Sequence, residues 1–156
     1  MAALKTNAMR ILDSKKIAYK HYEYDEGTTD GVLVAALLGQ PREKVYKTLV
    51  TVSASKNNYV FVIPVGETLD LKKAAKAVGE KSVAMIKQKE LMPLTGYIHG
   101  GCSPVGMKKQ FITVIHSAAA DLDTFCVSAG HVGNQIEVSV SDIAKLINAE
   151  FAEIIV

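Results

Sequence analysis

The chain has 156 residues, 49% of them hydrophobic, so it is long enough for one sizeable core and short for two. Its 18 Lys and Arg residues and 16 Asp and Glu residues leave a net charge of +2, which excludes a protein that binds nucleic acid through bulk charge but leaves room for a local basic face. Two cysteines exclude a disulfide framework, and the spacing of the four histidines argues against a structural metal site.

The beginning of the chain gives no sign of export. Residues 1–7 lack an apolar segment of the signal-peptide kind, and no apolar run approaches the ~18 residues that span a membrane. No linker rich in Pro, Gly or Ser divides the chain, so one domain is predicted over residues 1–156. We expect a reduced, cytoplasmic protein that has no cofactor, no metal and no contact with a membrane.

The N-terminal part of the chain shows helical and strand periodicity in turn. A short helix is predicted over 6–15 with Thr6 as its cap, and a strand is predicted over 17–24. A second helix is predicted over 28–38, with Asp30 near its start.

Strands predominate in the rest of the chain. The turn residues 55–58 join two β-branched runs and predict a hairpin. Ser141 is predicted to cap the last helix. Strands are predicted at 45–54, 59–65, 82–86, 97–99, 111–116, 125–128 and 135–140, and helices at 69–78, 89–92 and 142–148.

The order of these elements indicates the fold class. Strands that cluster, instead of alternating strictly with helices, are typical of an α+β fold. We therefore expect a curved sheet, mixed or mainly antiparallel and barrel-like, with helices around it. The chain contains no internal repeat and no low-complexity tract.

The segment 97–109 is rich in glycine and small polar residues and ends in two lysines. Such a segment can present backbone amides to an anion, or to negative charge that develops in a reaction. It is not a P-loop, because Met107 stands where that motif needs Lys, and it is not a nucleophile elbow, because Val105 stands where Gly is needed. Cys102 lacks a recognisable His partner and is interpreted as a small apolar group. The alternative for the whole segment is a tight structural turn.

Lys47 is an unusual residue for a strand. Alternation places it on the same face as Val45 and Leu49, which would direct its ammonium toward an apolar or concave side. A buried ammonium is costly unless it meets an anion. The alternative is an edge strand whose lysine reaches water and prevents pairing with another sheet.

Several motifs resemble, in their order, those of the YbaK/EbsC family of bacterial aminoacyl-tRNA deacylases. The specific pair is Tyr-Lys-Thr-Leu at 46–49 and Gly-Gly-x-Ser-Pro-x-Gly-x-Lys-Lys at 100–109. The segments 69–75, 95–97 and 127–130 also match, so the resemblance covers essentially the whole chain. The family is related to the editing domain of prolyl-tRNA synthetase.

The resemblance implies a fold, an activity and a site. The fold would be that of the prolyl-tRNA synthetase editing domain. The reaction would be hydrolysis of mischarged Cys-tRNA(Pro), or Cys-tRNA(Cys), by the substrate's own thiol at a backbone oxyanion hole, without a cofactor. The implied partners are the 3′ end of an aminoacyl-tRNA and prolyl-tRNA synthetase. The implied catalytic positions are Lys47, Gly101 and Cys102, the last two through their backbone. The implied substrate-binding positions are Tyr22, Thr48, Gly100, Ser103, Pro104, Gly106, Ser128 and Gly130.

The chain departs from the family pattern at two places. Relatives often have an aromatic residue near Asp30 and an acid near Gln135, and this chain has neither at those positions. Its first helix looks closer to the EbsC-like branch. Three alternatives therefore stay open: a deacylase with another aminoacyl preference, a module that binds tRNA ends or a synthetase without catalysis, and a metal-independent esterase or phosphatase of small molecules.

Overall fold

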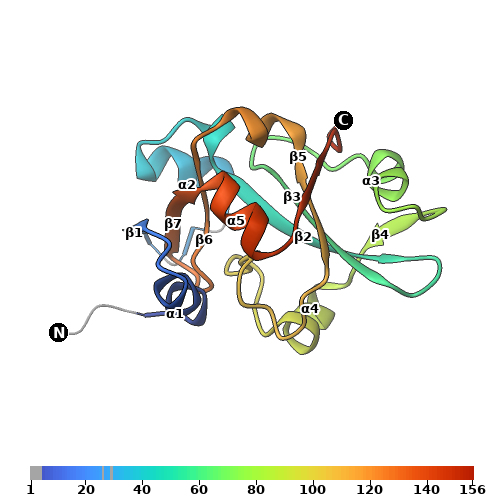
Figure 1. The fold of residues 1–156 in the computed structure, drawn as a ribbon, viewed down its shortest axis with the longest axis horizontal. Coiled ribbons are helices and arrows are strands. Elements are labelled where there is room, and N and C mark those ends of the chain that lie inside the picture. Colours follow the sequence, from blue (N-terminus) through green and yellow to red (C-terminus); the bar gives the residue numbers. More distant parts are fainter. Residues whose placement is uncertain (1–4, 26, 29) are drawn as a thin grey trace.

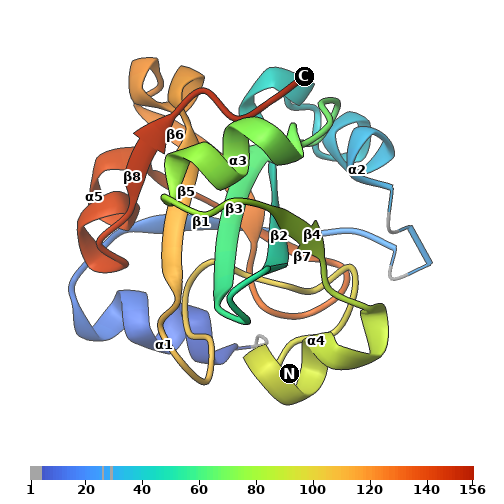
Figure 2. The same cartoon turned by 90° about the vertical axis from the view of Figure 1, so that its right-hand side faces the viewer.

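Two β-sheets and five α-helices are found in a computed structural model that describes residues 5–25, 27–28 and 30–156 (Figures 1 and 2). Residues 1–4, part of the segment 1–7 considered above, and residue 29 of the second predicted helix lie outside this description. No described helix is both long and apolar enough to cross a membrane. The helices are α1 (Asn7–Ser14), α2 (Gly31–Leu38), α3 (Leu71–Ala77), α4 (Gln88–Thr95) and α5 (Val140–Leu146), with the 3₁₀ helices η1 (Arg42–Lys44) and η2 (Ser117–Asp121). The strands are β1 (Tyr19–Glu23), β2 (Tyr46–Ser53), β3 (Asn58–Pro64), β4 (Val83–Met85), β5 (Ile112–His116), β6 (Thr124–Ser128), β7 (Asn134–Ser139) and β8 (Glu150–Ala152).

The first two helices begin at capping side chains. The Thr6 hydroxyl accepts a hydrogen bond from Met9 N–H at the start of α1. The Asp30 carboxylate accepts from the N–H groups of Val32 and Leu33 at the start of α2. These side chains satisfy N–H groups that a first helical turn leaves unpaired. Both helices are therefore confirmed, although each begins slightly later than predicted.

The predicted strand at 97–99 is wrong. Gly96 and Gly100, on either side of this segment, have φ angles of 85° and 87°, which turn the backbone away from an extended path. Tyr97 is held inside the turn, because its hydroxyl donates a hydrogen bond to the Val105 carbonyl at 2.6 Å. The flanking glycines therefore decide the local structure, not the short apolar alternation.

Three later elements also differ from the prediction. Helix α5 begins earlier, because Ser139 and not Ser141 accepts the N–H of Asp142. The predicted helical turn at 89–92 is the longer helix α4, which continues through Pro93. The sequence does not predict β8, whose three residues are too few for a recognisable alternation and which pairs in parallel with β5.

The two sheets confirm the mixed α+β class, but the expected barrel-like closure is not found among the described residues. The first sheet is antiparallel in the order β1-β7-β6, and the second is mixed in the order β4-β2-β3-β5-β8. Its outer strands β4 and β8 have only three residues each, which leaves no long edge to close a barrel. A β-bridge between Val45 and Cys126 links the two sheets.

The core fills both faces of the five-stranded sheet. Val60 of β3 lies in the main buried cluster, together with Phe125 and Ile136 of the other sheet. Phe61, the next residue along β3, lies in a second buried cluster with Ala74 of α3. Figure 2 shows α3 across this second face. The alternation along β3 therefore buries side chains on both sides and fixes β2, its partner, in place.

Strand β2 leaves part of one edge unpaired. It pairs with β3 along its length, but on the other side it pairs with β4 only at 51–53. Val45, just before β2, forms the bridge to Cys126 of β6. The segment 46–49 therefore has no strand partner on its second edge in the described chain, and a pocket lies at this gap.

Candidate functional site

A pocket of about 160 Å³ lies where the unpaired edge of β2 meets the loop after α4. We call it the central pocket. No Asp or Glu is found among its described lining residues, so Lys47 gives it a positive charge. The lining residues are Tyr24, Gly31, Val34, Val45, Tyr46, Lys47, Thr48, Leu49, Val65, Leu91, His99, Gly100, Cys102, Ser128 and Gln135.

Lys47 lies half-buried in the wall of the central pocket. It pairs with Ile63 of β3 on one side, and its strand is an edge on the other. Within the described ranges, its ammonium forms no ion pair with a carboxylate. An ammonium at a concave wall without an internal counter-ion is suited to an anionic ligand. Both interpretations of the sequence thus apply in part, because the strand is locally an edge and the lysine lines a concave site.

The loop after α4 brings backbone donors to the central pocket. Gly100 and Cys102 line the pocket, and their N–H groups have no hydrogen-bond acceptor in the part of the chain that the structure describes. Gly101 N–H, in contrast, donates to the Ile98 carbonyl at 3.0 Å. The amides on either side of Gly101 are therefore unpaired in the described chain, while Gly101 itself supports the turn.

Close packing of glycines fixes this loop. A Cβ atom at Gly101 would lie 3.0 Å from the backbone nitrogen of Val132, in the turn between β6 and β7. Gly106 and Gly130 have φ angles of 84° and 97°, and a Cβ at either would lie within 3.0 Å of the Tyr97 side chain. The loop therefore holds one backbone path, which sets the positions of its free amides.

Three buried polar atoms in the pocket wall have no hydrogen-bond partner among the described residues: the hydroxyls of Tyr46 and Thr48 and Oε1 of Gln135. Tyr46 is 1% exposed and Gln135 is 7% exposed. Burial raises the pKa of Tyr46 to about 12, so its hydroxyl keeps its proton at neutral pH. An unpaired buried polar group costs free energy, so a ligand or water molecule bound in this pocket would be stabilised by pairing with these three atoms.

The side chains of the central pocket do not form a prepared nucleophile. Burial raises the pKa of the Cys102 thiol to about 12, whereas the thiolate is the reactive form. The Ser128 hydroxyl accepts a hydrogen bond from Gly130 N–H. His99 has no hydrogen bond to either side chain in the described structure. Among the described lining residues, no nucleophile is thus held by a general base as in covalent catalysis.

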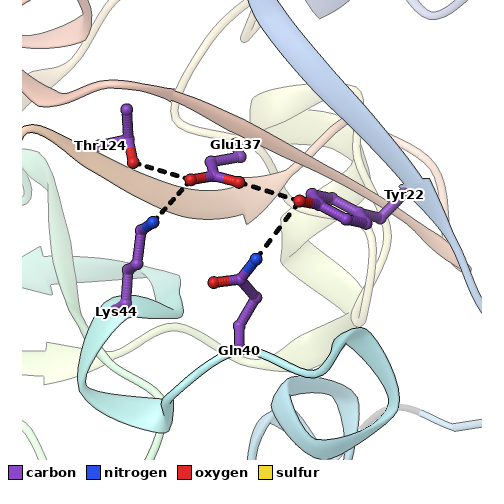
Figure 3. A network of polar contacts seen from close by, with 5 residues as sticks. All are labelled: Tyr22, Gln40, Lys44, Thr124 and Glu137. Atoms are coloured by element: carbon purple, nitrogen blue, oxygen red, sulfur yellow. Dashed lines mark hydrogen bonds and ion pairs between the residues drawn. The ribbon is translucent and has the colours of Figure 1, made fainter.

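Five side chains form a polar network between the three-stranded sheet and the segment that follows α2 (Figure 3). Lys44 and Thr124 donate hydrogen bonds to Oε2 of Glu137 at 2.6 and 2.8 Å. The Tyr22 hydroxyl donates to Oε1 of Glu137 at 2.9 Å and accepts from Gln40 at 3.3 Å. The hydrogen bond from Lys44, with those from Thr124 and Tyr22, lowers the pKa of Glu137 to about 2. The network therefore ties η1 and the end of α2 to the three-stranded sheet.

The structure brings together some of the predicted site residues and not others. Lys47, Thr48, Gly100, Cys102 and Ser128 line the central pocket. The others lie in the network of Figure 3 or in the loops that hold the pocket: Tyr22, Gly101, Ser103, Pro104, Gly106 and Gly130. The described ranges contain no group of three or more His, Cys, Asp or Glu residues that could hold a metal ion.

Several lining residues were not predicted from the sequence. Tyr24 lines the pocket where Tyr22 was expected, and His99 and Leu91 come from the region of α4 and its loop. Tyr46 stands beside Lys47 in the family motif, and Gln135 stands at a position where the family often has an acid. Their places in the family pattern could have predicted Tyr46 and Gln135 as site residues, whereas nothing in the sequence marks Leu91 as one.

Comparisons with known proteins identify the family to which this fold belongs. A sequence profile of the aminoacyl-tRNA editing domain matches residues 26–146. A protein of Enterococcus faecalis with the name "Putative Cys-tRNA(Pro)/Cys-tRNA(Cys) deacylase EbsC" is 47% identical over 152 residues, which cover 96% of this chain and 93% of that protein. The resemblance identified in the sequence is therefore confirmed.

Solved structures show the same fold. A structure described as "a putative trans-editing enzyme for prolyl tRNA synthetase" has a TM-score of 0.86 at 22% identity, covering 99% of both chains. A hypothetical protein has a TM-score of 0.88 at 20% identity, covering 97% of this chain and 100% of its own. At these identities the likeness concerns the fold alone. From the sequence profile and the relative that is 47% identical, the chain belongs to the aminoacyl-tRNA editing domain family.

Proposed function

We propose that the protein hydrolyses the ester bond of a mischarged aminoacyl-tRNA, with Cys-tRNA(Pro) and Cys-tRNA(Cys) as substrates. The observation that carries this proposal is the central pocket, which combines free backbone amides with a lysine and has no prepared nucleophile. The name of the Enterococcus relative supports the reaction and both substrates. Membership of the editing-domain family supports tRNA as the carrier.

The substrate supplies its own nucleophile in this reaction. The sulfur of the esterified cysteine attacks the carbonyl carbon, the bond from that carbon to the ribose oxygen breaks, and the thiol proton is transferred to the leaving oxygen. Water then opens the cyclic thioester to give free cysteine. A thiol with a pKa of about 8.5 is a few per cent thiolate at neutral pH, so the attacking species is available without a base from the protein.

The protein contributes position and stabilisation of charge. The amides of Gly100 and Cys102 donate to the carbonyl oxygen as it becomes negative, and one such donor contributes about 3–4 kcal/mol. Lys47 binds the 3′-terminal nucleotide of the tRNA, where negative charge enters the site. Oε1 of Gln135, a buried acceptor without a partner in the described chain, accepts a hydrogen bond from the α-ammonium group of the substrate.

The test is incubation of the purified protein with a panel of charged tRNAs, following the loss of the aminoacyl bond. We expect rapid loss of cysteine from tRNA(Pro) and tRNA(Cys), unchanged by a metal chelator. Binding of the charged tRNA with no loss of any aminoacyl bond would instead identify a module that binds tRNA ends without catalysis. Loss of a different amino acid at the highest rate would contradict the substrate assignment.

We also propose that prolyl-tRNA synthetase is a partner, and that the reaction takes place in the cytoplasm, where this synthetase charges its tRNA. The support for this partner is the description of one solved structure with the same fold. Co-elution of the protein with prolyl-tRNA synthetase and tRNA(Pro) in size-exclusion chromatography would support a complex. Separate elution at micromolar concentrations of all three would contradict it.

A further inference from the structure

The loop that carries the unpaired amides of Gly100 and Cys102 packs against the turn between β6 and β7. A Cβ atom at Gly101 would lie 3.0 Å from the nitrogen of Val132 and 3.3 Å from the carbonyl carbon of His131, and both are backbone atoms of this turn. Backbone therefore packs directly on backbone, with no flexible side chain between them to absorb a movement. The positions of the two amides thus depend on where the turn lies.

Asn134, the first residue of β7, holds this turn with both its side chain and its backbone, and it is only 6% exposed. Its side-chain Nδ2 donates a hydrogen bond to the Val132 carbonyl at 3.2 Å. Its backbone N–H donates to the His131 carbonyl at 3.1 Å, and its own carbonyl accepts from Ala129 N–H at 3.0 Å. Val132, the residue that packs on Gly101, is therefore fixed from its other side by a buried amide.

Strand β1 fixes the other end of the same amide. Oδ1 of Asn134 lies 2.7 Å from Nε2 of His21. Because the Val132 carbonyl can only accept, Asn134 presents Nδ2 to it and Oδ1 to His21, so His21 donates through its Nε2–H. The imidazole of His131 also reaches the Val132 carbonyl, at 2.9 Å, but it is exposed, so water can replace this contact. The buried tie between β1 and the turn is therefore the side chain of Asn134.

We propose that Asn134 is a positioning residue for the deacylation reaction: its amide fixes Val132, and Val132 fixes the loop whose amides meet the developing negative charge. This inference rests on the proposed function and adds to it a residue that does not touch the substrate. The next residue, Gln135, lines the central pocket, and successive strand residues point to opposite faces, so the Asn134 side chain points away from the pocket. Preorganised donors act only when they are held in place, and a displacement of about 1 Å can cost about 100-fold in rate.

The first test compares two asparagines that make the same kind of contact. Asn134→Ala should lower kcat for Cys-tRNA(Pro) by roughly 10- to 100-fold, the scale of a misplaced catalytic group, with KM nearly unchanged because Lys47 stays in place. Asn58→Ala is the control: Nδ2 of Asn58 donates to the Thr51 carbonyl at 3.1 Å in the other sheet, and Asn58 does not line the central pocket. Its kcat should stay close to that of the wild type. Equal losses of kcat in the two variants would overturn the proposal.

Two further variants separate the two ends of the amide. Asn134→Asp keeps the size of the side chain and an acceptor for His21 but removes the donor to Val132, so its kcat should fall as in Asn134→Ala. His21→Ala removes only the partner of Oδ1, and we expect a smaller loss of kcat, roughly 2- to 10-fold, the scale of one hydrogen bond. Wild-type kcat in Asn134→Asp would overturn the proposal. If neither Asn134 variant folds, His21→Ala decides, because His21 is only partly buried, and an unchanged kcat in that variant would overturn the proposal.

The second test observes the loop without catalysis. The backbone N–H signals of Gly100 and Cys102 are compared by NMR in the wild-type protein, Asn134→Ala and Asn58→Ala, with no substrate present. We expect Asn134→Ala to shift both signals, because the loop follows the turn, and Asn58→Ala to leave them in place. Unshifted signals in Asn134→Ala would overturn the proposal, since the amides would then hold their positions without this side chain.

The two tests together separate this inference from the proposed function. A wild-type protein that hydrolyses no aminoacyl-tRNA would overturn the proposed activity, whether or not the signals of Gly100 and Cys102 shift in Asn134→Ala. A wild-type protein that hydrolyses Cys-tRNA(Pro), with the same kcat and the same amide signals in Asn134→Ala, would retain the activity and overturn the positioning role of Asn134.

Discussion

Lys47 lies half-buried in the wall of the central pocket, without a counter-ion among the described residues. Because the folded protein gains no ion pair from it, its removal should cost little stability. We expect Lys47→Ala to reduce kcat/KM for Cys-tRNA(Pro) by more than about 100-fold, as for loss of a charge-assisted contact to substrate, with Tm nearly unchanged. Lys76→Ala, on α3, is the matched control. A Lys47→Ala protein that unfolds readily but still hydrolyses would show that Lys47 is structural.

Cys102 carries one of the unpaired amides of the loop, yet its thiol is predicted to take no part in the reaction. Burial raises its pKa to about 12, so almost none of it is thiolate at neutral pH. Cys102→Ala and Cys102→Ser should therefore retain most of the wild-type kcat, measured in single-turnover deacylation. A trapped acyl-enzyme at Cys102, or complete loss of activity in both variants, would overturn the thiol-assisted mechanism.

Gly101 acts through the backbone of its neighbours. A Cβ atom there would lie 3.0 Å from the Val132 nitrogen, so either the loop or the turn at Val132 must give way, and we expect the amides of Gly100 and Cys102 to move. We expect Gly101→Ala to lower kcat by roughly 100-fold or more, the scale for loss of one oxyanion donor. Gly66→Ala is the control, because its added Cβ would meet Arg42 at an ordinary 3.5 Å. Equal kinetics for the two variants would exclude this loop as the oxyanion hole.

At the scale of elements, Glu137 of β7 joins η1 to the three-stranded sheet. Its pKa of about 2 in the folded protein lies below the ordinary value of 4.5, because the hydrogen bond from Lys44 favours the carboxylate. The resulting stabilisation is complete above about pH 5 and is lost as the pH falls through the range from about 4.5 to 2. Glu137→Gln should lower the free energy of unfolding at pH 7 by about 1–3 kcal/mol. This range lies between the losses typical of breaking an exposed salt bridge and a buried one.

The pH dependence supplies the check on this interpretation. The free energies of unfolding of the wild-type protein and of Glu137→Gln, measured by thermal and denaturant unfolding, should differ by a constant amount from pH 7 to about pH 5. This difference in free energy should become smaller as the pH falls further. The glutamine has no charge to lose in that range. A difference that is the same at pH 3 and pH 7 would mean that the packing of the side chain, and not its charge, stabilises the junction.

The elements also show how far sequence reasoning reaches. Capping by Thr6 and Asp30, and the hairpin of β2 and β3, follow from local chemistry, so they could be predicted. The segment 97–99 could not, because its flanking glycines, Gly96 and Gly100, can adopt either sign of φ, and the sequence alone does not show that both are positive. The network around Glu137 joins side chains that are up to 115 positions apart, and no local pattern records such a pairing.

At the scale of the whole molecule, the site arises from a gap between two open sheets. Lys47 and Gly100 were predicted because they belong to recognisable motifs. Gln135 and Tyr24 enter the pocket only because β7 and β1 lie in the other sheet, which the bridge from Val45 to Cys126 holds against β2. The motif thus predicts residues of the pocket wall, whereas the shape of the pocket, which can contribute to the choice of substrate, depends on how the sheets meet.

That choice of substrate can be tested through the chemistry of the esterified amino acid. With the substrate thiol as the attacking group, Cys-tRNA(Pro) should be hydrolysed much faster than Ser-tRNA or Ala-tRNA, because a hydroxyl is almost wholly protonated at neutral pH and a methyl group cannot attack. The rate on the cysteinyl ester should rise with pH toward the thiol pKa of about 8.5, since the thiolate fraction rises in that range.

The measurement is the first-order rate constant of ester loss for the three amino acids on the same tRNA, corrected for uncatalysed hydrolysis. The rates are measured from pH 6 to about pH 9, a range that covers the thiol titration. Placing all three on one tRNA removes any difference in how the RNA is bound. Equal rates for cysteinyl and alanyl esters would point to an activated water molecule and a pocket that selects by size. In that case Tyr46, Thr48 and Gln135, whose buried polar atoms have no partner in the described chain, would be the groups that hold the water, and their substitution should lower the rates for both esters equally.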